Sequence, residues 1–257
     1  MLYFSSLLKN ENLFSALKNA GEEFAYLNGT KDIWARDYMP VKSAGNEFVS
    51  FSYSPSYLKE FDDLRTDYFR DVYPFIGIAA ERSDIRLDGG NTVFSPQKRK
   101  VIITDRFIDE NPEYTPDVLI RKTENLLGAE VIIIPALKSD ITGHADGVVR
   151  FINENAVAGN STAYKNGYEQ KVKKVLKTHG IDTVDFPYFE SGGISAQGCY
   201  INFLKTENNI FLPVFNCKTD ASAVSAAKII FNMNVIPVEI NSIARCGGGL
   251  NCISWET

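Results

Sequence analysis

Residues 246–256 read CGGGLNCISWE, which places a glycine triplet and Cys252 close to one end of the chain. Glycine is normally found where the backbone takes a positive φ angle or approaches another group closely. Chain ends usually fray, whereas a reactive cysteine needs a rigid setting that excludes water. The stretch therefore indicates either a cysteine without a role or a segment that is held inside the fold.

The rest of the chain supports the second interpretation, because it repeats one order of elements. Each copy consists of a glycine-rich or acidic turn, two alternating runs that form a hairpin, a helix and a short strand. The copies begin at residues 34–40, 88–91, 142–147, 191–198 and 246–255. The last copy is incomplete, since only one strand follows its turn.

Within the copies, the pattern predicts hairpins at residues 41–53, 92–104, 148–159 and 200–215, and closing strands at residues 84–87, 130–137, 182–186 and 235–240. A helix is expected between each hairpin and its closing strand. The predicted helical faces contain Phe61, Leu64, Tyr68 and Val72; a helix over Thr115–Leu127 with Thr115 as its cap; Tyr164, Tyr168, Val172 and Val175; and Val224, Ala227 and Phe231.

The elements missing from the last copy are found at the N-terminus. Residues 2–6 read as a strand, residues 12–21 as a helix ended by Gly21, and residues 23–27 as a closing strand. Five units in 257 residues give about 51 residues each, a period typical of propellers and arrays. The sequence thus predicts an α/β fold of five ββαβ units, closed into a ring by pairing of the N- and C-terminal strands. We expect one domain over residues 1–257, since no linker interrupts the pattern.

Composition narrows the function classes. A formal net charge of −5 disfavours nucleic acid or an anionic membrane surface as the main partner. The four cysteines match no zinc-ligand or disulfide-scaffold pattern, and the first residues lack the basic region of a signal peptide. We therefore expect a cytoplasmic protein without membrane contact, metal or organic cofactor. The outer helices of such a ring could pair with another copy or remain solvated, so both a monomer and an oligomer are compatible with the pattern.

The repeat also aligns the residues that carry chemistry. The turns that enter the hairpins contain Asp37, Asp88, His144 with Asp146, and Cys252. In a closed ring, equivalent turns converge on one axis, and a cysteine, a histidine and carboxylates meeting there are the organisation expected of an active site.

These residue types favour nucleophilic catalysis over metal binding, because no second histidine accompanies His144. Converging carboxylates repel one another unless a cation lies between them, and a planar guanidinium matches carboxylates well. Breaking a guanidinium requires a thiolate, a proton donor for the departing amine and negative charge to hold the cation. The sequence offers all three.

Five segments carry a family resemblance: WARDYMP, LDGGN, TGHADGVVRF, YINF with NNIFLPVF, and GGGLNCISW. In this order they resemble the signature segments of the agmatine deiminase and bacterial-type peptidyl-arginine deiminase family, over residues 34–255. That family belongs to the guanidine-modifying penteins, so the resemblance implies the same five-bladed ββαβ propeller.

The resemblance also implies roles for individual residues. Cys252 would be the nucleophile and His144 the general acid and base, while Asp37 and Asp146 would hold the guanidinium nitrogens. Asp88 would orient His144 and contact the substrate, although many relatives have glutamate there.

Three further positions are implied to form the substrate site. Trp34 would form one wall, with Gly249 and Asn251 beside the cysteine. Agmatine deiminases usually have histidine in place of Asn251, so this position leaves the substrate open.

The implied activity is hydrolysis of a guanidinium group to a ureido group, with release of ammonia through a cysteine-linked thiouronium. The substrate would be agmatine, giving N-carbamoylputrescine as in putrescine biosynthesis, or peptidyl-arginine, giving citrulline. Two alternatives remain: an amidinotransferase of the same fold, and a non-catalytic pentein that binds a guanidino ligand or a macromolecule.

Simpler roles are expected for the remaining polar residues. Arg36 and Arg150 are interpreted as structural ion-pair partners, and His179 as a residue at a helix end. The other cysteines are expected to be small buried residues; they are Cys199, Cys217 and Cys246.

Overall fold

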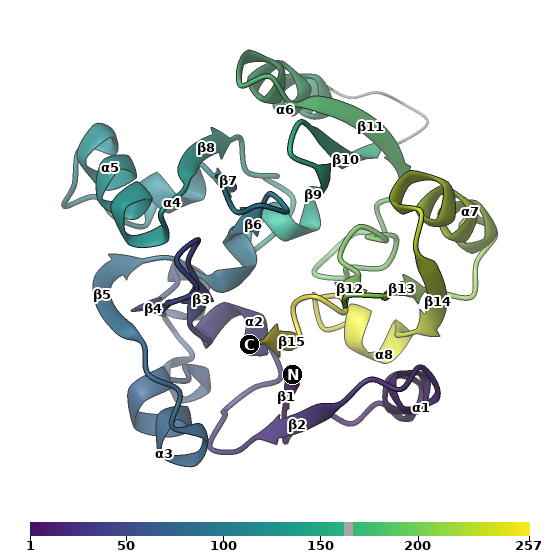
Figure 1. Ribbon diagram of the computed structural model, residues 1–257, viewed down its shortest axis with the longest axis horizontal. Helices are drawn as coiled ribbons and strands as arrows, with labels where there is room; N and C mark the ends of the chain where they lie inside the picture. Colours follow the sequence, from purple (N-terminus) through teal and green to yellow (C-terminus); the bar gives the residue numbers. More distant parts are fainter. Residues whose placement is uncertain (162–166) are drawn as a thin grey trace.

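The computed structural model describes residues 1–161 and 167–257 and places five three-stranded sheets in a ring (Figure 1). Each sheet has an inner, a middle and an outer strand, in that order from the axis of the ring. The sheets are β15 (Ser254–Glu256), β1 (Leu2–Ser5) and β2 (Phe24–Leu27); β3 (Val41–Lys42), β4 (Phe48–Ser52) and β5 (Glu81–Arg86); β6 (Val93–Phe94), β7 (Lys100–Thr104) and β8 (Glu130–Ile134); β9 (Val149–Asn153), β10 (Ala156–Ser161) and β11 (Asp182–Pro187); and β12 (Leu204–Lys205), β13 (Asn209–Val214) and β14 (Asn234–Glu239).

All five sheets pair in the same way. The inner strand is antiparallel to the middle strand, and the middle strand is parallel to the outer strand. A parallel pair needs a crossover connection, which is usually a helix. The helices on the outside of the ring are α1 (Glu11–Asn19), α3 (Tyr73–Ile76), α5 (Pro116–Leu127), α6 (Gly167–Thr178) and α7 (Thr219–Phe231), and the short helices α2 (Ala35–Tyr38), α4 (Arg106–Asp109) and α8 (Asn241–Ala244) complete the fold. The predicted ββαβ ring is confirmed.

Closure of the ring by the two terminal strands is also confirmed. β1 lies between β15 and β2, and Tyr3 is paired with Trp255 across the antiparallel ladder. The buried indole of Trp255 donates a hydrogen bond of 2.7 Å to the carbonyl oxygen of Pro40, in the next unit of the ring. Strand β15 is therefore held by β1 on one side and by Pro40 on the other. This fixes the end of the segment before β15, which contains Cys252.

The prediction of a helix in the first unit is wrong for the half that contains Phe61 and Leu64. Phe61 and Leu64 are 52% and 38% exposed, and only short turns form at Ser56–Leu58 and Asp62–Leu64. The side chain of Asp67 accepts a hydrogen bond of 2.8 Å from the backbone N–H of Arg70, which starts a new helical turn beyond it. This cap explains why helical structure begins at residue 68.

The predicted Tyr68 and Val72 are buried, as the helical pattern requires. Helix α5 ends as predicted at Gly128, with φ of 66°, but Thr115 makes no side-chain cap bond. Tyr164 lies outside the described residues. Among the described residues, no helix has the length and apolar character needed to span a bilayer.

The turns that lead into the inner strands place polar groups near the axis. Helix α2 precedes β3, a 3₁₀ turn at Gly89–Asn91 precedes β6, and a 3₁₀ turn at Ala145–Gly147 precedes β9. Asn91 joins the last two turns, because its Oδ1 accepts hydrogen bonds from the backbone N–H groups of Thr104 (2.9 Å) and Ala145 (3.1 Å).

Candidate active site

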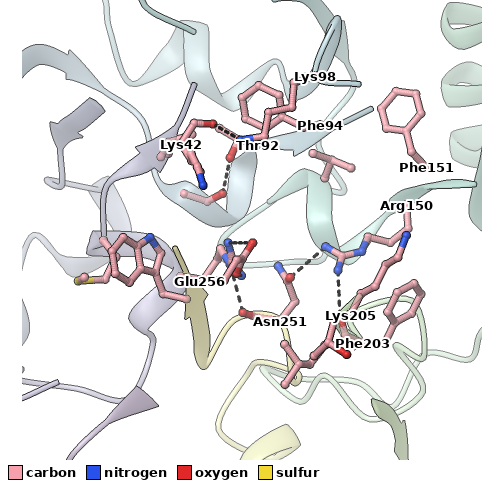
Figure 2. Close-up of a pocket in the computed structure, with 18 of the residues that line it drawn as sticks. Lys42, Thr92, Phe94, Lys98, Arg150, Phe151, Phe203, Lys205, Asn251 and Glu256 are labelled. Carbon is pink, nitrogen blue, oxygen red and sulfur yellow. Dashed lines mark hydrogen bonds and ion pairs between the residues drawn. The ribbon is translucent and has the colours of Figure 1, made fainter. Parts of the chain in front are cut away.

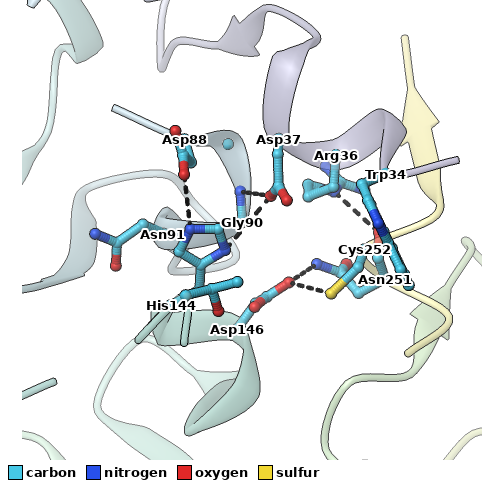
Figure 3. A network of polar contacts seen from close by, with 12 residues as sticks. Trp34, Arg36, Asp37, Asp88, Gly90, Asn91, His144, Asp146, Asn251 and Cys252 are labelled. Carbon is cyan, nitrogen blue, oxygen red and sulfur yellow. Dashed lines mark hydrogen bonds and ion pairs between the residues drawn. The ribbon is translucent and has the colours of Figure 1, made fainter. Parts of the chain in front are cut away.

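The candidate residues of these turns meet at one place near the axis (Figure 3). His144 and Cys252 lie on opposite sides of it, with Asp37 and Asp146 between them. Asp88 lies above the imidazole in this view and contacts it. The structure thus brings together the five residues expected to carry the chemistry.

His144 is buried, with 3% of its surface exposed, between two carboxylates. Its Nε2 lies 2.9 Å from Asp88 Oδ2, and its Nδ1 lies 3.5 Å from Asp37 Oδ1. Burial by itself lowers the pKa of His144, but Asp37 and Asp88 outweigh it and raise that pKa to about 10. The imidazole therefore carries its proton at neutral pH and can act as an acid.

The carboxylate of Asp37 is packed tightly against the 88–91 turn. Its Oδ1 accepts a hydrogen bond of 3.1 Å from the backbone N–H of Gly90. A Cβ atom at Gly90 would lie 2.5 Å from Asp37 Oδ1 and 2.8 Å from His144 Nδ1, so only glycine allows this approach. Burial, with Asp88 and Asp146 nearby, raises the pKa of Asp37. Such crowding of acids favours a cationic ligand.

Cys252 contacts two polar side chains. Its Sγ lies 3.6 Å from Asp146 Oδ2 and 3.3 Å from Asn202 Oδ1. The Asn251 side chain donates a hydrogen bond of 2.7 Å to the same oxygen of Asp146. Burial raises the pKa of the Cys252 thiol, and the carboxylates Asp146 and Asp37 raise it further. In the free protein the group is therefore a thiol at neutral pH.

This protonation state predicts how the thiol reacts with iodoacetamide. Because only the thiolate is alkylated, the rate at Cys252 should rise about tenfold per pH unit from about pH 7 to pH 9, without a plateau. The rate can be followed by peptide mass spectrometry in a Cys217→Ser/Cys246→Ser background, since those two side chains are exposed. A plateau at or below about pH 8 would show that the environment does not hold the thiol protonated.

Cys252 and Asp146 line a cavity of about 150 Å³. Its walls include Gly249 from the glycine triplet and two residues of the fourth unit's turn, Gly192 and Gly193. The cavity gives the thiol a route to a small ligand.

Two residues expected at the substrate site lie elsewhere. Trp34 is packed against the glycine triplet, because a Cβ atom at Gly248 would lie 2.3 Å from its ring; it supports the cavity wall from behind. Asn251 lines a different cavity, on the far side of the loop from Cys252, and reaches the site through its hydrogen bond to Asp146.

Sequence reasoning missed two contributors. The Tyr57 hydroxyl donates a hydrogen bond of 2.9 Å to Asp88 Oδ2, and Asn202 Oδ1 accepts from the backbone N–H of Cys252 at 3.3 Å. Asn202 follows the turn of the fourth unit, so the register of the repeat could have identified it. Tyr57 lies in an irregular segment that carries no such signal.

The structure also corrects some of the simpler roles. Cys217 and Cys246 are exposed rather than buried, and Cys199 is half-buried at the wall of the Cys252 cavity. Arg36 forms the expected ion pair, 2.5 Å from Glu256.

Arg150 and His179 make contacts that the sequence pattern does not predict. Among the described residues, Arg150 has no ion pair; it donates hydrogen bonds to Asn251 Oδ1 (2.9 Å) and to the carbonyl oxygen of Phe203 (3.0 Å). His179, just after α6, lies 3.0 Å from Glu130. No group of histidine, cysteine or acidic residues in the described part of the chain is arranged to ligate a metal ion.

A ring of five ββαβ units with its terminal strands paired is the pentein fold, and solved structures show the same architecture. Agmatine deiminase from C. jejuni superimposes with a TM-score of 0.76 at 18% identity, over 99% of this chain and 92% of that chain. Agmatine deiminase of Enterococcus faecalis gives 0.72 at 17% identity, over 96% of this chain and 80% of that chain. At these identities the likeness concerns the fold.

The sequence defines the family. The Porphyromonas-type peptidyl-arginine deiminase family matches residues 15–257, and the chain belongs to that family. A Lactococcus lactis protein named "Putative agmatine deiminase" is 24% identical over 233 residues. This match covers 77% of the chain and 60% of the relative, so the chain spans about 60% of the length of that curated relative.

Proposed function

We propose that the chain is a hydrolytic deiminase that uses Cys252 as nucleophile and His144 as proton donor and acceptor. The observation that carries the proposal is their placement on opposite sides of a site flanked by Asp37 and Asp146 (Figure 3). A planar guanidinium held by both carboxylates would present its carbon to the sulfur and its nitrogen to the imidazolium.

The first half-reaction forms an enzyme-bound intermediate. When the cationic substrate binds, its positive charge favours the Cys252 thiolate, and the thiol proton is released to solvent. The thiolate then attacks the guanidinium carbon and forms a C–S bond. The protonated His144, whose pKa is raised to about 10, donates its proton to one amino group, and the C–N bond breaks with release of ammonia. An S-alkylthiouronium on Cys252 remains.

The second half-reaction reverses these roles. His144, now neutral, removes a proton from water, and the hydroxide adds to the same carbon. The C–S bond then breaks, the thiolate leaves, the added hydroxyl group loses its proton to solvent, and a neutral ureido product is released. Asp88, which accepts hydrogen bonds from His144 and Tyr57, would hold the imidazole in the orientation that both steps need.

The cavity around Cys252 favours agmatine among the possible substrates. Of the described residues that line it, none is lysine or arginine, so nothing there would pair with the carboxylate of free arginine. Asp140 and Glu190 line the same cavity and suit the ammonium group at the other end of agmatine. The arginine side chain of a peptide comes with neither the free carboxylate of arginine nor the ammonium group of agmatine. Peptidyl-arginine is therefore the second candidate.

Substrate preference can be tested with a ureido-product assay on agmatine, free arginine and a blocked arginine peptide. We expect the highest kcat/KM with agmatine. Glu190→Gln should raise the KM for agmatine about twofold to fivefold, because it removes one partly solvated ion contact with the ammonium group. It should leave the KM for the peptide unchanged.

Glu207→Gln, which removes an exposed carboxylate from outside the cavity, is the matched control. An equal rise in KM for both substrates would count against recognition of a second cation. Amidino transfer to an added amine, without ureido product, would instead favour the amidinotransferase alternative.

A further inference from the structure

Figure 2 shows residues that line a second and larger cavity, of about 340 Å³. Neighbouring residues of the same loops face in different directions. Asn251 lines this cavity whereas Cys252 lines the first, and Arg36 lines it whereas Asp37 faces His144. Among the described residues, the two cavities share no lining residue.

The inner strand of every sheet reaches this second cavity, so it lies at the axis of the ring. The contributing residues are Lys42 from β3, Phe94 from β6, Arg150 from β9, Lys205 from β12 and Glu256 from β15. A cavity that every unit of the ring helps to form is a feature of the whole fold.

Its charge is opposite to that of the protein. Five basic residues line the cavity against one carboxylate, Glu256, although the chain has a net charge of −5. The basic residues are Arg36, Lys42, Lys98, Arg150 and Lys205. Only Arg36 has an ion-pair partner among the described residues, and that partner is Glu256.

Two of the other four cations make hydrogen bonds to neutral oxygens alone. Lys98 Nζ donates to the carbonyl oxygens of Lys42 and Ser43, at 2.8 and 3.2 Å, and Arg150 donates to Asn251 and Phe203. Lys42 and Lys205 have no polar partner among the described residues for their ammonium groups.

The proximity of these cations to one another is electrostatically unfavourable. Burial and the nearby Lys42 lower the pKa of Lys98 to about 8. Burial and the nearby Arg36 likewise lower the pKa of Arg150, to about 10. Both lowered pKa values indicate that the surroundings disfavour the charged forms of Lys98 and Arg150. An anion bound between these two side chains would stabilise their charged forms and raise both pKa values again.

We propose that this cavity binds a small oxyanion that carries at least two negative charges, either a phosphate ester or a polycarboxylate. The guanidinium group of Arg150, which has only neutral partners among the described residues, can donate to such oxygens, and the lysines add point charges around it, whereas Arg36 is already paired with Glu256. The volume of the cavity lies in the range of small-ligand pockets, and Phe94, Phe151 and Phe203 give it apolar walls.

The proposal is independent of the deiminase reaction. The substrate proposed for the first cavity is a cation, which the basic cavity would repel. Binding of an anion can therefore be measured in the purified protein without any assay of turnover, and failure of one proposal leaves the other intact.

Isothermal titration calorimetry with two probes tests the site. Inorganic pyrophosphate represents phosphate esters and citrate represents polycarboxylates, in a chloride buffer of low ionic strength, about 50 mM, so that screening is modest. Lys42→Gln/Lys205→Gln should weaken binding of the preferred probe by at least about tenfold, because it removes two charges from the cavity. These two lysines are chosen because their ammonium groups support no hydrogen bond among the described residues.

The control variant is Lys171→Gln/Lys228→Gln, which removes the same charge from two outer helices, α6 and α7. It should change the affinity less than twofold. Saturable binding of either probe, with loss only in the first variant, supports the site, and the better probe identifies the class of anion. No binding of either probe at millimolar concentration, or an equal loss in both variants, would overturn the proposal.

Discussion

Cys252→Ser is expected to reduce kcat for ureido-product formation by about 10³-fold or more, with the fold retained. The proposed reaction requires a thiolate at Cys252, whose Sγ lies 3.6 Å from Asp146 Oδ2, and a serine hydroxyl cannot ionise to a comparable extent at neutral pH. The substitution is nearly isosteric, so the contact with Asn202 can persist. The measurement is product formed from agmatine by purified wild-type and variant protein, with circular dichroism as the check on folding.

The matched control is Cys199→Ser, at the wall of the same cavity. Its sulfur lies 3.4 Å from the carbonyl oxygen of Gly147, and burial raises its pKa to about 12, so it is an unreactive thiol. Its serine variant should keep most of the activity. Turnover that persists in Cys252→Ser but disappears in Cys199→Ser would transfer the role of nucleophile to Cys199.

The second large effect concerns His144. His144→Gln should lower kcat by about 10²- to 10⁴-fold, the usual contribution of a positioned acid and base. Proton donation to the departing amine requires the imidazolium, and His144 has a pKa raised to about 10. The wild-type rate should therefore fall on the alkaline side as the pH passes through about 10, because the proton on His144 is then lost.

Asp88→Asn distinguishes this role from a purely structural one. Asp88 is one of the carboxylates that raise the pKa of His144, so its neutral variant should move the alkaline limb of the pH–rate profile to lower pH. Tyr57→Phe removes a hydrogen bond to Asp88 but no charge. It should therefore leave the pH at which the rate falls on the alkaline side nearly unchanged. An unchanged limb in Asp88→Asn would mean that His144 is not the group that titrates there.

The repeat explains how much of this site could be predicted from sequence. Asp37, Asp88, His144 and Cys252 occupy equivalent turns, and equivalent turns of a ring must meet. The closing pair of strands followed from the same pattern, because the elements absent from the last unit are present at the N-terminus.

The failures have local physical causes. The apolar spacing near Phe61 predicts a helix there, but the cap formed by Asp67 starts helical structure later in the chain. Asn251 and Cys252 are adjacent in sequence and line opposite cavities, and the direction of each side chain depends on the turn's geometry.

The basic cavity escaped prediction for a different reason. Lys42, Arg150 and Lys205 are far apart in sequence, and each is an ordinary charged residue in its own strand. Only the closed ring reveals that they face one another.

The pairing of β1 with β15 also has a kinetic consequence. Tyr3 and Trp255 are separated by nearly the whole chain, so their contact closes a very long loop, and such contacts form late in folding. The segment with Cys252 lies directly before β15, and its other contacts, such as the hydrogen bond from the Cys252 backbone N–H to Asn202, also join residues that are far apart in sequence. During refolding, Cys252 should therefore become positioned after the sheets of the interior units have formed, and recovery of the proposed activity should lag behind recovery of secondary structure.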